Sequence, residues 1–388
     1  MTTSSETINH AQILGVTIKA ENETYDITGA MLEINLYESL DMIAVMGDLN
    51  FLDNHRLYES VFGGEEVTIK FDICEMVYDI TLVVYAVTGK NLDDRGGLVQ
   101  LKVAEKHYIE NSVKSASGMY DDNCSVIMSK LLSNLGVSTI ITDSTKQSKT
   151  LSIPHMKPFE AIELIRTQTS SPSGQKMFVY GTLSQGVIID SLDKMLERKP
   201  MESMFRYEVG ESPLNPDDIN EKISILARTI HKVTVADSID ALAMVKDGFF
   251  GVRNNSIDMF NKTMVTTNYG SGSGLVEQGD APRVNSVTNS SVSSLGWDMG
   301  EDRYTRAKNH SSFTLENLLV SPFMFRGLST IGHAITVVFP NNTYNVEGDS
   351  PFDLKRSGEF IITHSRLSIK PGKATFTMNA VSKVRNNV

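Results

Sequence analysis

Short runs of alternating hydrophobic and polar residues fill the first hundred positions of the chain. In EVTIKF, the side chains of Val67, Ile69 and Phe71 share one face of an extended strand, and Thr68 and Lys70 share the other. Similar runs, separated by Gly, Asp and Asn turn signals, are QILGVTIKA, ITGAMLEINLYES, MGDLNFLD, YDITLVVYAVTG and GLVQLKVAEKHYI. This density of short strands predicts a small β-barrel or sandwich, and we assign residues 1–109 to a first β-barrel.

The hydrophobic period changes near residue 110. DDNCSVIMSKLLSNLGV predicts a helix with capping candidates at Asp122 and Asn123 and a stop at Gly136. KPFEAIELIRTQ predicts a second helix that begins at Pro158. KMFVYGTLSQGVIIDSLDKM then predicts a hairpin with Gly186 in its turn, so residues 110–200 are expected to form an α/β domain.

Strand-like runs return after residue 200. We predict strands in ILARTIHKVTVAD, FFGVRNNSIDMFNKTMVTTNYG, FMFRGLST, HAITVVFP, GEFIITHSRLSI and KATFTMNAVS, and short helices in SIDALAMVKDG and SSFTLENLLV. The stretch 270–300, rich in Gly, Ser and Asn, predicts a long loop or interaction arm. Residues 201–236 and 301–388 are assigned to a second β-barrel, and 237–300 to an inserted segment.

Two octapeptides repeat one pattern, GEEVTIKF from residue 64 and GHAITVVF from residue 332. A short pattern of this kind also arises by chance in strand-rich proteins. Each copy, however, is followed by a long strand, a polar turn and another strand, and the spacing far exceeds solenoid or propeller periods of about 20 to 50 residues. We therefore favour a duplicated module whose structural core comprises Gly64, Val67, Ile69, Phe71, Gly332, Ile335, Val337 and Phe339.

The predicted fold class is a mixed, β-rich α+β fold: two related small antiparallel β-barrels, an α/β domain and an inserted segment. Three copies of such a chain carry six similar barrels. A ring of six barrels could face a six-fold partner on one side, while the trimer meets a three-fold partner on the other.

Composition narrows the classes of function. The 388 residues carry a net charge of −11, which argues against a sequence-independent grip on DNA through clustered Lys and Arg. Cys74 and Cys124 are the only cysteines and are expected to be buried, as in a protein made in a reducing cytoplasm. Neither a signal peptide nor an apolar run of about 20 residues is apparent, so no membrane anchor is expected.

Carboxylate pairs are the main candidates for catalysis, because glycoside hydrolysis uses two carboxyl groups at a fixed separation. All four fall at predicted turns or helix starts, where acidic residues are common: Glu65–Glu66, Asp93–Asp94, Asp121–Asp122 and Asp217–Asp218. The eight histidines show no metal-ligand spacing, and His231 and His364 are expected to be partly buried strand residues. We predict no catalytic residue, cofactor or metal site.

Three other features have competing interpretations. The run GSGSG at 270–274 lacks the residues of a nucleophile elbow or a phosphate loop and is typical of a linker. SIDALAMVKDG fits a packed surface helix better than a membrane-surface helix. Trp297 fits either an anchor for a partner or a local packing residue.

Several segments, in order along the chain, resemble the baseplate hub proteins of contractile-tailed (T-even-type) bacteriophages, which are related to the hub portion of type VI secretion spike proteins. The segment from ITGAMLEINLYES to GGEEVTIKFD looks like the family's opening barrel. KPFEAIELIRTQT with its following hairpin resembles the family's proline-initiated helix, and GFFGVRNNSIDMFNKTMVTTNYG resembles a hub segment. GLSTIGHAITVVFP with SGEFIITHSRLSIKPGKATFTMNAVS looks like the end of the second barrel.

This resemblance implies a non-enzymatic structural protein of the virion's tail baseplate, made in the host cytoplasm. It implies a homotrimer whose pseudo-six-fold ring joins the tail tube, or a tube-initiator protein, to the central spike. Tape-measure and baseplate wedge proteins are further expected partners, and DNA is expected to pass through a polar or acidic channel without specific binding. Residues 270–300 depart from the family pattern, and no lysozyme or needle domain is appended.

Two other functions fit the β-rich pattern. A tail-associated glycan hydrolase would use one of the carboxylate pairs, and a carbohydrate-binding adhesin would use the strands rich in Ser, Thr and Asn. Loss of glycan turnover on changing one pair to Asn or Gln would identify the hydrolase. The adhesin would need several aromatic side chains exposed on one surface.

Overall fold

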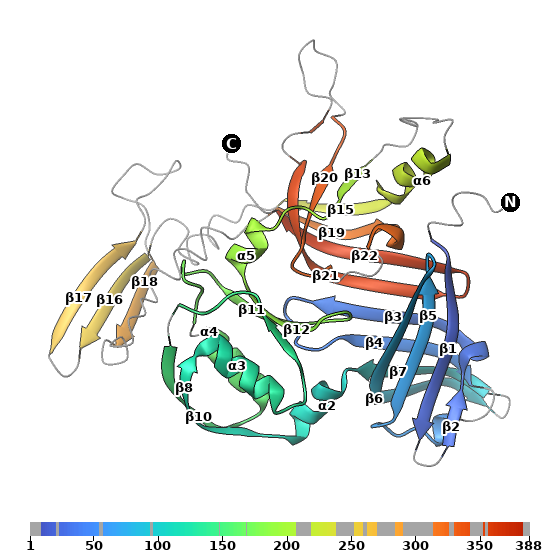
Figure 1. Ribbon diagram of the computed structural model, residues 1–388, viewed down its shortest axis with the longest axis horizontal. Coiled ribbons are helices and arrows are strands. Elements are labelled where there is room, and N and C mark those ends of the chain that lie inside the picture. The colour runs from blue at the N-terminus through green and yellow to red at the C-terminus, as the bar shows by residue number, and fades with distance from the viewer. Residues whose placement is uncertain are drawn as a thin grey trace, which may run out of the picture.

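A computed structural model describes most of the chain. The described residues are 9–20, 23–53, 57–93, 96–146, 148–167, 169–206, 219–237, 252–258, 262–269, 284–289, 313–325, 330–341, 352–353 and 356–382. Figure 1 shows the N-terminal strands in blue, a compact α/β region in green and the C-terminal strands in red.

The N-terminal half forms an antiparallel, strongly curved set of strands in the order β3-β4-β7-β6-β5-β1-β2. The strands predicted from the sequence in this region are confirmed, except that the end of GLVQLKVAEKHYI begins the helix α2 (Lys106–Val113), and the short β2 is an addition. Two 3-10 turns, at Thr28–Ala30 and Leu57–Glu59, connect them. The strands are β1 (Ala11–Ala20), β2 (Glu23–Asp26), β3 (Met31–Ser39), β4 (Met46–Asp53), β5 (Glu66–Ile73), β6 (Met76–Asp93) and β7 (Gly96–Ala104).

The middle region packs helices against short strands around its own apolar core. Both predicted helices are confirmed: Asn123 caps the first, its side chain accepting a 3.0 Å bond from the Ser125 amide, and Pro158 begins the second. The hairpin β11–β12 is also confirmed, with Gly186 at φ +74°. The elements are α2 (Lys106–Val113), β8 (Ala116–Asn123), α3 (Cys124–Ser133), β9 (Thr139–Ile141), β10 (Ser148–Met156), α4 (Pro158–Thr167), β11 (Met177–Thr182), β12 (Gly186–Ser191) and α5 (Leu192–Glu197).

The described residues of the C-terminal half return to strands, interrupted by helix α6 (Ile219–Ala227) and a three-stranded sheet, β17-β16-β18. Figure 1 draws this small sheet apart from the others. The elements are β13 (Ser203–Arg206), α6 (Ile219–Ala227), β14 (Thr229–Ile230), β15 (Lys232–Asp237), β16 (Val252–Asp258), β17 (Thr263–Tyr269), β18 (Val284–Asn289), β19 (Phe313–Val320), a 3-10 turn (Pro322–Phe325), β20 (Ala334–Val338), β21 (Gly358–Lys370) and β22 (Lys373–Ser382).

The prediction of a helix in SSFTLENLLV is wrong, because this segment contains strand β19. A bulge between Leu315 and Leu318 turns both side chains into the core, so a spacing of three residues occurs within a strand. Asn317 occupies this bulge at φ +53°. The spacing of these two apolar residues is therefore the same as in a helix, which explains the wrong prediction.

Three further expectations for this half need correction, and three lie outside the described residues. FMFRGLST begins in a 3-10 turn at Pro322–Phe325, not a strand, and the start of ILARTIHKVTVAD belongs to α6. Strand β18 interrupts the loop predicted over 270–300. SIDALAMVKDG, Trp297 and the run at 270–274 lie outside the described residues.

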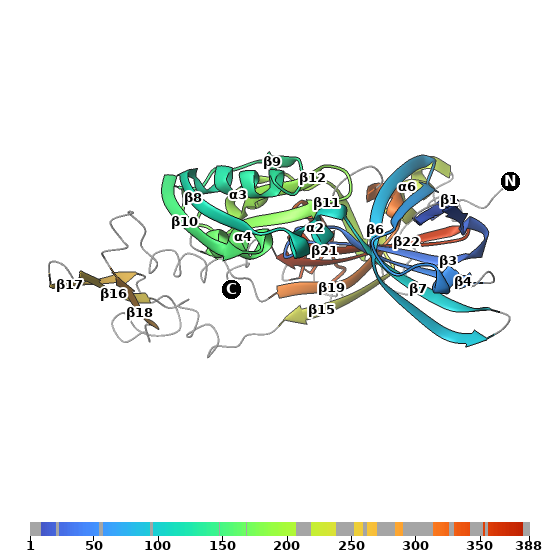
Figure 2. The same ribbon diagram turned by 90° about the horizontal axis from the view of Figure 1, so that it is seen from below.

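The two predicted barrels are not separate sheets. Antiparallel neighbours run without interruption as β15-β19-β22-β21-β3-β4-β7-β6, within one sheet of fourteen strands. Figure 1 shows the red β21 alongside the blue β3 at the boundary. Figure 2 shows the long β6–β7 hairpin extending beyond its neighbours. Pairing between strands from opposite ends of the chain thus joins the halves.

The two octapeptides adopt the same backbone arrangement. Gly64 and Gly332 both have positive φ, at +101° and +75°. The Gly64 amide donates to the Val84 carbonyl at 2.8 Å, and the Gly332 amide donates to the Ile362 carbonyl at 3.0 Å. Val84 and Ile362 in turn donate their own amides to the residue that follows each glycine, at 3.0 and 2.9 Å.

The long strand that follows each octapeptide has its bulge at the same step. In β6 the ladder with β7 shifts between Val84 and Ala86, directly after the bond to the first glycine. In β21 the ladder with β22 shifts between Ile362 and His364, directly after the bond to the second glycine. Bulges are specific features of a strand, so a shared position is stronger evidence of kinship than shared apolar residues.

The two glycines differ in what surrounds them. A Cβ atom at Gly332 would lie 2.7 Å from the Tyr180 hydroxyl oxygen and 3.3 Å from Nη1 of Arg198. At Gly64, no atom lies within 4 Å of such a Cβ. The α/β region therefore packs against the second octapeptide, whereas the same point of the first is uncovered by described residues.

This difference gives a matched pair of variants. Both Gly64→Ala and Gly332→Ala place a side chain at positive φ, which costs about 1 to 2 kcal/mol. Only Gly332→Ala also forces Cβ against Tyr180, and overpacking adds about 1 to 3 kcal/mol. We expect chemical denaturation to show the larger loss of unfolding free energy for Gly332→Ala. Equal losses would contradict the described contact.

Candidate functional site at the junction of the two halves

The residues with the most specific contacts lie where the two halves and the α/β region meet. Strands β3 and β21 pair over six positions, from His364 opposite Ser39 to Ile369 opposite Ile34. Polar side chains bond across the seam: Arg366 donates to the Asn35 side-chain oxygen at 2.9 Å, and Ser368 donates to Glu33 at 2.8 Å.

Glu38 is the residue shared by all three regions. It lies on β3 with only 5% of its surface exposed. One carboxylate oxygen accepts a 2.7 Å bond from the Leu183 amide in the β11–β12 turn, and the other accepts a 3.1 Å bond from the Ser365 hydroxyl on β21. Burial raises the pKa of Glu38 to about 6, against the opposing effect of these two bonds. Glu38 therefore ties the turn and β21 to β3.

A close backbone approach reinforces the same contact. The Gly181 amide of β11 donates to the Met42 carbonyl at 2.9 Å, and a Cβ atom there would lie 2.5 Å from the Ile43 carbonyl oxygen. Only glycine lets β11 lie this close to the β3–β4 loop.

A buried ion pair holds the α/β region against the second octapeptide. The Asp190 side chain is fully buried and is paired with Arg198, which also donates a 2.9 Å bond to the Gly332 carbonyl. Tyr180 donates to the same carboxylate at 3.2 Å, and burial followed by the Asp190 charge raises the Tyr180 pKa. A buried charge is tolerated when its hydrogen bonds are satisfied, as they are here.

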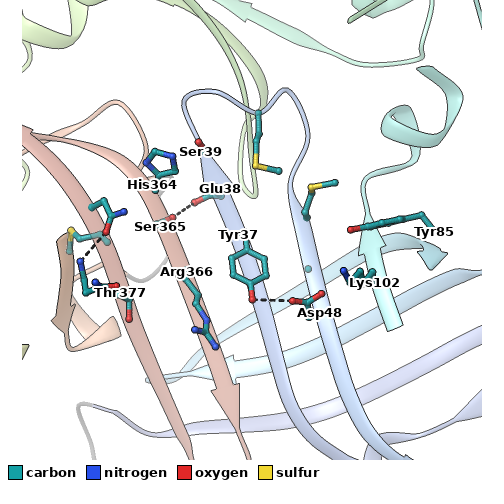
Figure 3. A pocket seen from close by; sticks show the side chains of 16 residues that line it. Tyr37, Glu38, Ser39, Asp48, Tyr85, Lys102, His364, Ser365, Arg366 and Thr377 are labelled. Atoms are coloured by element: carbon teal, nitrogen blue, oxygen red, sulfur yellow. Dashed lines mark hydrogen bonds between the residues drawn. The ribbon is translucent and has the colours of Figure 1, made fainter. Parts of the chain in front are cut away.

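A hollow of about 440 Å³ opens over the seam, lined by residues of β3, β4, β6, β7, β19, β21 and β22 (Figure 3). Tyr37 donates to Asp48 at 3.1 Å, and the Arg366 guanidinium lies 5.9 Å from the Tyr37 ring centre. Burial, followed by the Asp48 charge, raises the Tyr37 pKa to about 12. Both carboxyl groups in the hollow, Glu38 and Asp48, already accept bonds from neighbours. These contacts hold neighbouring strands together, which indicates a structural role for the polar residues of the hollow.

A second perturbed carboxylate lies beside the junction. Burial raises the pKa of Glu105 to about 7, and the Glu38 charge adds to this, while a 2.7 Å bond from the Val45 amide opposes it. Its neighbour His107 contacts the Ile43 carbonyl at 3.2 Å, and burial lowers its pKa.

The predicted carboxylate pairs have structural partners. Glu65 accepts bonds from the Phe62 and Gly63 amides at 2.9 and 2.8 Å, and Asp122 forms a 2.8 Å ion pair with Lys130. Asp121 accepts a bond from Thr150 at 2.9 Å. Asp94, Asp217 and Asp218 lie outside the described residues.

The predicted core positions lie where their alternation places them. The two glycines begin the octapeptides, and the six apolar side chains are buried, at 7% exposure or less: Val67, Ile69, Phe71, Ile335, Val337 and Phe339. The expected partial burial of His231 and His364 is wrong, because both side chains are exposed. His231 lies between β14 and β15, and His364 lies on β21 at the seam. Cys74 and Cys124 are buried thiols.

The sequence analysis missed Glu38, Asp190 and the seam. One signal for Glu38 was present: it follows Ile34 and Leu36 on the apolar face of a strand, where an acidic residue needs partners.

No helix among the described residues is long and apolar enough to cross a membrane. Within the same residues, no group of three or more His, Cys, Asp or Glu side chains could hold a metal ion.

The raised carboxyl pKa values predict how stability depends on pH. Ionising Glu105 costs more in the folded chain than in the unfolded chain, so stability falls as pH rises from about 4.5 through about 7. Glu105→Gln removes this cost, on the order of 2 to 3 kcal/mol at pH 8, and flattens the profile. We expect urea unfolding between pH 5 and 8 to show this. Glu197→Gln, at an exposed carboxylate, is the control, and identical slopes for Glu105→Gln and the unmodified chain would refute the assignment.

Comparison with known proteins finds no match in sequence, but it finds solved structures with a similar fold. No protein-family profile matches this chain, and no curated protein matches it. The 43 kDa tail protein of prophage MuSo2 from Shewanella oneidensis is similar with a TM-score of 0.58 at 12% identity, covering 95% of this chain and 98% of that one. A tail protein from Neisseria meningitidis MC58 gives 0.58 at 10% identity, covering 95% and 96%.

A chain of the half-lidded PdpA–VgrG complex from Francisella is also similar, with a TM-score of 0.50 at 10% identity. It covers 97% of this chain and 58% of that one. The similarity to tail proteins spans nearly the whole chain and includes both halves and the region between them. This chain therefore has the fold of phage tail proteins, which confirms at the level of the fold its resemblance to baseplate hub proteins.

Proposed function

We propose that this chain is a structural baseplate hub of a phage tail, without enzymatic activity. Three copies form a pseudo-six-fold ring that joins the six-fold tail tube to the three-fold central spike. The observation that carries this proposal is the repetition of one hydrogen-bond pattern and one bulge in the two halves of a single chain. Two similar modules per chain, in three chains, supply six similar modules.

We propose that each half is a small barrel. In support, pairing in the second half runs β14-β13-β20-β21-β22-β19-β15, and only His231 separates β14 from β15. The His231 amide donates to the Leu319 carbonyl at 2.9 Å across that gap. In the first half, the Ala374 amide of β22 donates to the Asn9 carbonyl just before β1, at 2.8 Å.

The domain boundaries follow the same proposal. We assign 1–109 to the first barrel, 110–200 to the α/β domain, 201–236 with 301–388 to the second barrel, and 237–300 to the insertion. Three separate apolar cores support the first three units, although Ile369 and Ala374 of the second half pack into the core of the first.

We propose that the polar face of the shared sheet lines the channel through which DNA passes without specific binding. On β3, Glu33 and Tyr37 share this face with Arg366 of β21, which covers the buried Asn35. Glu33 lies 3.6 Å from the Arg366 guanidinium and 3.7 Å from the Lys370 amine. Compensated charges favour a polar, mixed wall over the strongly basic wall that would hold DNA.

The proposed partners are the tail tube or a tube initiator, the central spike, and the tape-measure and wedge proteins of the baseplate. The proposed location is the tail baseplate of the virion after synthesis in the host cytoplasm. The Francisella chain with a similar fold is part of a PdpA–VgrG complex, which supports a place among spike-associated proteins. A hydrolase lacks comparable support, because Glu65 accepts bonds from backbone amides in a turn and Asp122 forms an ion pair with Lys130.

Light scattering with mass determination tests the proposal. The chain has a mass of 42.9 kDa, and we expect the purified protein to show three times that value and to bind tube or spike protein. Negative-stain images are expected to show a ring with a central hole. A stable monomer that joins neither partner would contradict the proposed function.

A further inference from the structure

The eight-stranded run from β15 to β6 ends in two open edges. Among the described residues, β6 pairs with β5 only up to Val83, and no strand pairs with that edge from Ala86 to Asp93. At the other end, β15 pairs with β19, and no described strand pairs with its outer edge over Lys232–Asp237. Open strand edges present unpaired amide and carbonyl groups and invite another strand.

The internal repetition shows what belongs on the edge of β6. Its counterpart is β21, since both follow an octapeptide and bulge at the same step. The matching edge of β21 is filled: β20 pairs with it up to Ile361, and β3 pairs with it from His364 onward. The edge of β6 is therefore the position at which a strand equivalent to β3 is missing.

Strand β15 is the equivalent of β3 in the second half. β3 pairs with β4, which pairs with β7, and in the same way β15 pairs with β19, which pairs with β22. Tyr37 lies opposite Met46, and Ala236 lies opposite Thr314. Met46 in its ladder with β7 and Thr314 in its ladder with β22 occupy equivalent positions. Ala236 is therefore the equivalent of Tyr37.

We propose that the β6 edge of one copy pairs antiparallel with the β15 edge of the next copy, in the register of β21 with β3. In that register, Arg366 faces Tyr37 and Leu367 faces Leu36. The corresponding pairs between copies are Thr88 with Ala236, and Gly89 with Val235. The proposal rests on the trimer proposed above and specifies which residues its subunits join.

The side chains at these edges suit the contact. Val87 packs against the first core, and Val233 and Val235 pack against the second, each only partly buried. Pairing the edges would extend this apolar face from one copy to the next. Thr88 and Ala236 are small and would leave no bulk between the strands. Three copies of eight strands would then close with no free edge, as closed sheets do.

A disulfide tests the register. Directly opposed residues on antiparallel strands have Cα atoms about 4.5 to 5.5 Å apart, within disulfide range. We expect the double variant Thr88→Cys, Ala236→Cys to form a covalent trimer on mild oxidation, seen on a non-reducing denaturing gel. The matched control is Ala86→Cys with Ala236→Cys, which moves one partner about 7 Å along the strand and is expected to cross-link at least tenfold less.

Light scattering on the reduced variants separates the two proposals. A trimer that cross-links through residues 86 and 236, or through neither pair, would overturn the register and leave the proposed function standing. A monomer would count against the proposed function itself. Each single-cysteine variant must stay uncross-linked, and an unchanged melting temperature of the reduced double variant shows that folding is retained. Any covalent trimer from a single-cysteine variant would also overturn the assignment.

Discussion

The pairing of β3 with β21 is the constraint on which the rest of the structure depends. It joins strands more than three hundred residues apart in the chain and makes one sheet of two modules. Glu38 lies at this seam and also holds the β11–β12 turn. Because its buried carboxylate costs free energy unless both oxygens are bonded, the turn, β3 and β21 are held in one arrangement. The relative orientation of the modules is thereby fixed.

Under the proposed function, that orientation lets the chain act as a subunit of a ring. One face of the shared sheet is apolar and covered, and the other carries polar residues such as Tyr37, Asp48 and Arg366. The α/β region covers the second octapeptide through Tyr180 and Arg198, but its counterpart around Gly64 is not covered in the same way. Similar modules in different surroundings are what a chain needs when it meets partners of different symmetry.

Sequence periodicity predicted individual elements well and their neighbours poorly. Alternation in EVTIKF and the helix at Pro158 depend on local chemistry, which nearby residues encode. The helix predicted in SSFTLENLLV was wrong because a β-bulge places two buried residues three positions apart, which is also the spacing of a helix. The seam and Glu38 escaped because a strand's pattern shows which face is buried but not which distant strand will pair with it. The sequence showed the repeat as two similar octapeptides, but the hydrogen bonds and the bulge that the two copies share appear only in the structure.

An electron cryomicroscopy map of the purified protein tests the central claim most directly. The account predicts three chains around a channel, with β3 and β21 paired inside each chain and six similar modules alternating around the ring. The strands nearest the channel should present the face that carries Tyr37 and Arg366. A map in which the modules of one chain lie apart, or in which this face is turned away from the channel, would contradict it.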